Sequence, residues 1–126
     1  QQLHFRARAR ISTVANSVAE LGFGSPTGTT AIVPNGAFWR FNSAGPSSVV
    51  PVFSFNGTEI TGSAVDLSAQ RSNYLTYEVY VTDDEILYTI QNTQTDTLLS
   101  RQKLALQASA PKTLPTSLRM SVSSPA

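Results

Sequence analysis

Apolar and polar residues alternate along most of this chain, which is the period of a β-strand with one buried face. In the segment LHFRARARIS, residues 3–12, Phe5, Ile11 and two alanines share one parity, and His4 shares the other with three arginines. No stretch has the period of about 3.6 residues that an amphipathic helix requires. The pattern predicts an all-β fold of roughly nine or ten short strands, arranged as an antiparallel β-sandwich or jelly roll.

Turn residues divide the chain between these segments. SVAELGFG, residues 17–24, is expected as the second strand, and AIVPNGAFWRFN, residues 31–42, turns at its Pro-Asn-Gly sequence. Asn56 and Gly57 lie between two apolar runs and give the strongest hairpin signal in the chain. Residues 61–73 are ambiguous, and the segment 97–106 has no clean apolar parity, so its facing is left open.

The segment EVYVTDDEILYTI, residues 78–90, places three carboxylates between two apolar runs. With Asp83 and Asp84 at the tip of a hairpin, one face carries only apolar pairs, which are Val81 with Ile86, Val79 with Tyr88, and Tyr77 with Ile90. We therefore predict a tight primed turn in which Asp tolerates a positive φ. The alternative is a calcium site, which requires a spaced acidic loop with a glycine pivot.

The inward parity of the predicted strands defines a core. We expect the following residues to be mainly buried: Phe5, Val18, Leu21, Trp39, Phe41, Phe53, Phe55, Tyr77, Val79, Val81, Ile86, Tyr88 and Ile90.

Composition limits the classes of partner. The chain has 126 residues, a formal net charge of +1 and no cysteine. This length suits one domain, residues 1–126, which is a whole protein or a piece of a longer chain because it begins at Gln1 and not at Met. A small net charge gives no general attraction to nucleic acid, and no apolar run reaches the about 18 residues of a membrane span. We expect neither a nucleic-acid partner nor membrane insertion.

Residues for common catalytic and metal sites are few. His4 is the only histidine, so a nucleophilic triad or a zinc site has no full set of side chains. The carboxylates outside the segment 83–85 are scattered one per segment, and their spacing nominates no acid/base pair. We therefore expect a non-enzymatic protein without a metal or other cofactor.

A row of arginines is the first candidate binding feature. Arg6, Arg8 and Arg10 share one face of the first strand, where guanidinium groups suit a polyanion, an acidic partner subunit or sugar carboxylates. The alternative is an outer face that only keeps the chain soluble.

Aromatic residues on polar faces form the second candidate. Phe38 shares a parity with Arg40, and Tyr74 and Tyr80 share a parity with Glu78. Such rings offer platforms for a sugar ring or a neighbouring subunit. The alternative is that a second layer of the protein covers them.

The order of several segments resembles a known family. FRARARISTVANSVAELGFGSPT, GAFWRFN and YLTYEVYVTDDEILYTIQNTQTDTLL follow one another as in a β-sandwich module of bacteriophage virion proteins. That module is similar to concanavalin A-like jelly rolls of the lectin, glucanase and laminin G type. The resemblance covers most of the chain and rests on strand patterns. The acidic catalytic triplet of the glucanase branch is missing, since YEVYV offers only Glu78.

The resemblance implies a concanavalin A-like jelly roll with a structural role in a virion, on the tail, baseplate, fibre or capsid surface. Its implied partners are other copies of the chain and other virion proteins. A lectin-like module that recognises a host-surface carbohydrate is the alternative, and a polysaccharide-degrading enzyme is a third. Modules of this kind usually end with a strand beside the first one, whereas this chain stops after LRMSVSSPA. We therefore expect an open sheet edge that a neighbouring chain covers, in an oligomer for which a trimer is favoured.

Overall fold

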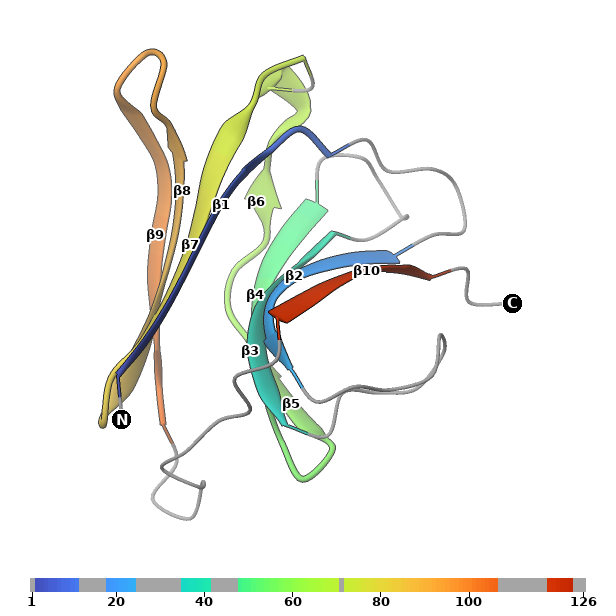
Figure 1. The fold of residues 1–126 in the computed structure, drawn as a ribbon, viewed down its shortest axis with the longest axis vertical. Coiled ribbons are helices and arrows are strands. Elements are labelled where there is room, and N and C mark those ends of the chain that lie inside the picture. Colours follow the sequence, from blue (N-terminus) through green and yellow to red (C-terminus); the bar gives the residue numbers. More distant parts are fainter. Residues whose placement is uncertain are drawn as a thin grey trace.

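The computed structural model describes residues 2–11, 18–24, 35–41, 48–70, 72–106 and 118–123, without the side chains of Val18 and residues 118–123. In these residues, two antiparallel sheets face each other and form a β-sandwich (Figure 1). One short 3-10 helix, Ser68–Gln70, is the only helical element there. None of the described helical segments is long and apolar enough to cross a membrane. The prediction of an all-β sandwich is confirmed.

The first sheet has four strands. Its order in space is β1-β7-β8-β9, so the first strand of the chain lies beside the seventh. The bounds are β1 Leu3–Ala9, β7 Leu75–Val81, β8 Glu85–Asn92 and β9 Thr97–Ala105.

The second sheet has six strands. Its order is β10-β2-β3-β4-β5, and β6 pairs with β4. The bounds are β2 Val18–Gly24, β3 Gly36–Phe41, β4 Ser48–Phe55, β5 Thr58–Thr61, β6 Val65–Asp66 and β10 Leu118–Ser123. The last described strand therefore pairs beside β2, and not beside β1.

The β7–β8 hairpin has the predicted register. Val81 pairs with Ile86, and the pairing continues to Thr76 with Gln91. The turn differs from the prediction, because Asn56 and Asp96 are the described non-glycine residues with positive φ, and neither aspartate at the tip is among them. Instead, the Thr82 hydroxyl, and not a backbone carbonyl, accepts the Glu85 N–H at 3.2 Å. The prediction of a primed turn was therefore wrong.

The Asn56-Gly57 pair forms the predicted tight turn between β4 and β5. Asn56 has φ 50° and Gly57 has φ 78°, as both central residues of a type I′ turn require. The flanking Phe55 and Thr58 are directly opposite each other.

A bulge in β9 explains why the segment 97–106 showed no clean parity. Ile90 pairs with Ser100 and Gln91 pairs with Leu98, so Leu99 is an extra residue in the ladder. The inward parity therefore changes at this point. Leu98 is left exposed, whereas Leu104 packs against the core.

The predicted core is confirmed for eleven of its thirteen residues, which are buried between the sheets. Phe55 is only half-buried, because it lies at the end of β4, although it packs against the core. The side chain of Val18 lies outside the described residues. Aromatic rings meet edge to face across the core, as Trp39 and Tyr88 do with centroids 5.6 Å apart.

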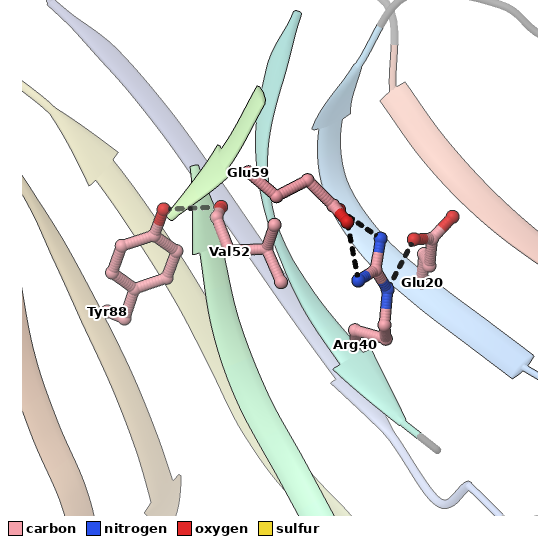
Figure 2. Close-up of polar contacts among 5 residues, drawn as sticks. All are labelled: Glu20, Arg40, Val52, Glu59 and Tyr88. Carbon is pink, nitrogen blue, oxygen red and sulfur yellow. Dashed lines mark hydrogen bonds and ion pairs between the residues drawn. The ribbon is translucent and has the colours of Figure 1, made fainter. Parts of the chain in front are cut away.

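Two hydrogen bonds tie the sheets together through the same aromatic pair. The Trp39 indole N–H, from the six-stranded sheet, donates to the Glu78 carbonyl at 3.2 Å. The Tyr88 hydroxyl, from the four-stranded sheet, donates to the Val52 carbonyl at 2.6 Å (Figure 2). The indole N–H of Trp39 and the hydroxyl of Tyr88 thus each have a hydrogen-bond partner. The two side chains can therefore be buried without leaving a polar group unpaired.

Candidate functional site

The outer face of strands β1 and β7 gathers most of the predicted site residues. The register pairs Arg6 with Glu78, Arg8 with Thr76, and His4 with Tyr80. We call this surface the β1–β7 face and define it by His4, Arg6, Arg8, Arg10, Tyr74, Glu78 and Tyr80. The structure therefore brings together two sets of residues that are about 70 positions apart in the sequence.

His4 joins the two strands at one end of this face. Its Nε2 lies 2.7 Å from a Glu78 carboxylate oxygen, and its ring meets that of Tyr80 edge to face at 5.5 Å. Sequence reasoning placed His4 among the arginines but not in the site, because its partners lie on a distant strand.

Tyr74 lies at the other end of the β1–β7 face, where two arginines contact its ring. The guanidinium groups of Arg8 and Arg10 lie 5.6 and 5.5 Å from the centre of its ring, within the range of cation–π contacts. The ring is still 50% exposed. No second layer of the described residues therefore covers the ring, although the chain's own arginines contact it.

The charges on the outer face of the four-stranded sheet are unequal. The register places four basic residues there, Arg6, Arg8, Arg101 and Lys103, and two acidic ones. Both acids have partners: Glu78 bonds His4 at 2.7 Å, and Glu85 pairs with Lys103 at 3.5 Å. Arg6 has no ion pair with any residue of the described part of the chain, although it lies directly opposite Glu78. This face therefore carries an excess of positive charge that the nearly neutral chain as a whole does not show.

Phe38 and Arg40 do not belong to an exposed site. Both lie on the outer face of the six-stranded sheet, where Phe38 is 0% exposed and forms a second apolar cluster with Val52. Arg40 lies over the Phe38 ring at 5.4 Å. The prediction of an exposed aromatic beside an exposed arginine was wrong, because this face of β3 is covered as well as its core face.

A glycine makes room for this second cluster. Gly22 lies opposite Phe38 and has φ +147°, which side chains rarely adopt. A Cβ at position 22 would lie 2.5 Å from the Ala37 carbonyl oxygen and 2.8 Å from the Phe38 Cβ. The glycine of the LGFG segment is therefore required by packing on this outer face.

Arg40 is held between two glutamates (Figure 2). Its Nε donates to Glu20 at 3.0 Å, Nη1 donates to Glu59 at 3.3 Å, and Nη2 donates to the other Glu59 oxygen. The Glu20 side chain is only 7% exposed. Burial lowers the pKa of Arg40, but the hydrogen bonds and negative charges of Glu59 and Glu20 outweigh it and raise the pKa above its ordinary value. The three side chains form a structural ion-pair network that links β2, β3 and β5 across the outer face of the six-stranded sheet, in which β4 lies between β3 and β5.

No group of three or more His, Cys, Asp or Glu side chains in the described ranges is placed to hold a metal ion. Tyr77 and Tyr88 are buried in the core, and burial raises the pKa of both hydroxyls. The β1–β7 face is thus the surface where exposed, chemically active side chains gather.

Comparison with known protein families, curated proteins and solved structures finds no match to this chain.

Proposed function

We propose that this chain is a non-enzymatic structural component of a bacteriophage virion, which assembles through its β1–β7 face with other copies of itself or with other virion proteins. The observation that carries the proposal is the gathering of arginine and tyrosine side chains on an exposed sheet surface beside an edge strand. Tyrosine and arginine are among the residues that are enriched at protein interfaces and at their energetic hot spots. For the assembly itself we propose an oligomer, with a trimer as the first symmetry to test.

The strand order supports the jelly-roll type that the sequence resembles. β1 is the neighbour of β7, and β10 is the neighbour of β2, so strands distant in the sequence lie side by side in both sheets. Greek-key connections, of which a jelly roll is built, produce such pairings. We propose the concanavalin A-like type of jelly roll as the finer class of this β-sandwich.

The state of the carboxylates supports a binding role more than a hydrolytic one. Glu20 and Glu59 are bound to Arg40, Glu78 to His4, and Glu85 to Lys103. A glycoside hydrolase uses two carboxyl groups, about 5 to 9.5 Å apart, on either side of the bond that it cleaves. Glutamates engaged by the chain's own cations are suited to holding strands together.

Recognition of a host-surface carbohydrate is the second candidate function. It is favoured by the half-exposed ring of Tyr74, because sugar rings stack on aromatic faces, and by the arginines beside it, which suit sugar carboxylates. Binding to a glycan array by the isolated chain would support this function over assembly.

Mass spectrometry of purified particles tests the proposal. In the phage that encodes the chain, we expect its peptides in purified particles, in multiple copies per particle. Recovery of the chain only from the particle-free fraction of the lysate would refute the structural role.

An arginine variant connects that test to the β1–β7 face. We expect the combined substitution Arg6→Ser, Arg8→Ser and Arg10→Ser to reduce incorporation into particles, because it removes exposed charges that a partner contacts. The stability of the isolated chain should change by less than about 1 kcal/mol, since exposed charges contribute little to folding. Arg101→Ser, on exposed β9, is the matched control. If the triple variant is incorporated normally, the arginines do not bind a partner and only keep the outer face soluble.

A further inference from the structure

Strand β1 lies at the end of the four-stranded sheet, and β7 is its only strand partner within the described part of the chain (Figure 1). The pairing runs through seven consecutive residues without a bulge. A regular edge strand presents a row of backbone N–H and C=O groups that another strand can bind.

The register shows which residues of β1 point to this open edge. In an antiparallel ladder, successive residues direct their backbone groups to opposite edges. The Thr82 N–H donates to the Glu85 carbonyl at 2.9 Å, so the even-numbered residues of β7 direct their backbone groups toward β8. Odd-numbered residues of β7 and β1 therefore bond each other, as in the pair of Phe5 with Val79. The even-numbered residues of β1 face the open edge, and these are His4, Arg6 and Arg8.

The residues whose backbone groups line the open edge are thus the same ones that carry the positive charges. Arg6 and Arg8 direct their N–H and C=O groups along the open edge and their guanidinium groups onto the β1–β7 face. Residues two apart in a strand are separated by about 7 Å, and a strand added beside β1 has the same repeat. Carboxylates at alternate positions of that strand would lie opposite the arginines, where cross-strand pairs of opposite charge are stabilising.

A second copy of β1 does not fit this edge. It would set one row of arginines beside another, and like charges directly opposite each other are destabilising. No other strand in the described ranges supplies the complementary pattern either, because β2, β5, β6, β7 and β8 each contain one carboxylate and the other described strands contain none. Charge complementarity therefore indicates a strand from a different protein.

The opposite edge of the sheet is interrupted by a bulge, which distinguishes it from β1. Strand β9 contains the bulge at Leu99, and Gln102 bonds both backbone groups of Ser63 at 2.8 and 2.9 Å. Bulges and covering loops are the devices that blunt edge strands. Strand β1 has neither in the described residues.

We propose that the open edge of β1 binds an extended segment of another protein with carboxylates at alternate positions, which adds a fifth strand to the four-stranded sheet. This inference rests on the proposed assembly role and narrows it: of the two partners proposed for the β1–β7 face, it selects a different protein over another copy of the chain.

Amide hydrogen exchange of the whole chain, measured by NMR, tests the proposal. The probe is a blocked nine-residue peptide in which glutamate alternates with valine and threonine. The control peptide has the same composition with its glutamates in one block. In the free protein, we expect fast exchange for the amides of Arg6 and Arg8, and slow exchange for those of Phe5 and Ala7. The alternating peptide should slow exchange at Arg6 and Arg8 by at least about tenfold, as new backbone hydrogen bonds form.

The affinities supply the second readout. The alternating peptide should bind at least about tenfold more tightly than the block peptide, a difference of about 1.4 kcal/mol. The double variant Arg6→Ser and Arg8→Ser should lose a similar factor, whereas Arg101→Ser should change the affinity less than twofold. A peptide N-methylated at the amides that face β1 should also bind more weakly, and this test leaves the protein unaltered.

Three results would overturn the proposal: equal affinity of the two peptides, binding that leaves the Arg6 and Arg8 amides unprotected, or binding of a polyuronate oligosaccharide to these arginines without binding of the peptide. The last result would assign the face to an anionic glycan. Failure of the peptide while the chain is present in purified particles would refute the acidic strand but not the assembly role. Absence of the chain from particles would refute the assembly role whatever the peptide does.

Discussion

Replacing Arg40 by methionine should strongly destabilise the fold, and the structure gives the magnitude. The substitution keeps an unbranched apolar stem over Phe38 but removes the charge that Glu20 and Glu59 share. Removing one partner of a buried ion pair costs about 3–5 kcal/mol, because the other charge stays buried without compensation. The Glu20 side chain is 7% exposed and that of Glu59 is 23% exposed, so water reaches one of them in part. We therefore expect the lower end of the range, about 3 kcal/mol.

Urea denaturation followed by tryptophan fluorescence measures this change. Trp39 is the only tryptophan and is fully buried, so its emission reports on the core. For a domain of this size, about 3 kcal/mol corresponds to a fall in Tm of roughly 9–15 °C. The control is the triple variant Glu20→Gln, Arg40→Met and Glu59→Gln, which leaves no unpaired charge and should recover most of the loss. A loss below about 1 kcal/mol for Arg40→Met, or no recovery in the triple variant, would refute the network as a determinant of stability.

Three further predictions concern the core and the turns. Tyr88→Phe should lower the free energy of unfolding by about 1 kcal/mol, because it removes the hydrogen bond to the Val52 carbonyl; urea denaturation that gives wild-type stability would contradict the bond. Burial raises the pKa of Tyr88 and Tyr77, so the folded state keeps both protons while the unfolded state loses its own above about pH 10. The stability should accordingly fall as the pH rises beyond about 10, and a constant midpoint of urea denaturation between pH 9 and pH 11 would oppose this reasoning. Gly57→Ala should cost about 1 kcal/mol because of its φ of 78°, whereas Asp84→Asn should change the stability by less than about 0.5 kcal/mol; thermal denaturation that ranks them in the reverse order would show that the turns are wrongly assigned.

The sequence was sufficient to predict the hairpins, because their information is local. A period of two fixed the facing of β7 and β8, and a slip by one residue would have mixed their apolar and polar faces. The Asn56-Gly57 pair specified its own turn type. The turn at Asp83 and Asp84 was predicted in the right place with the wrong geometry, since the hydroxyl of Thr82 takes the N–H that a primed turn would bond to a carbonyl.

The facing of β9 could not be read from its sequence. A bulge shifts the parity inside the strand, so residues before and after Leu99 follow different inward sets. The loop that precedes β9 is held by the side chain of Asn92, which accepts the N–H groups of Gln94 and Thr95, and Asp96 has φ 55°. The Asn and Asp at these positions were the available signal for that turn.

The site was predicted in part. Alternation placed the arginines of β1 and the tyrosines beside Glu78 on outer faces, and the structure joins these two faces into one. For Phe38 and Arg40, alternation within a strand shows which residues share a face but not what covers that face. The available signal was the nearly continuous apolar run GAFWRF, which is typical of a strand buried on both sides. The partners of Arg40 lie on other strands, and only the fold brings them together.

The most direct test of the assembly role compares the reactivity of arginines in the isolated chain and in purified particles. An arginine-selective dicarbonyl reagent, followed by peptide mass spectrometry, should modify Arg6, Arg8 and Arg101 in the isolated chain, where all three are exposed. In particles, we predict that Arg6 and Arg8 become protected while Arg101 on β9 stays reactive. Equal modification of Arg6 and Arg8 in both samples would contradict assembly through the β1–β7 face.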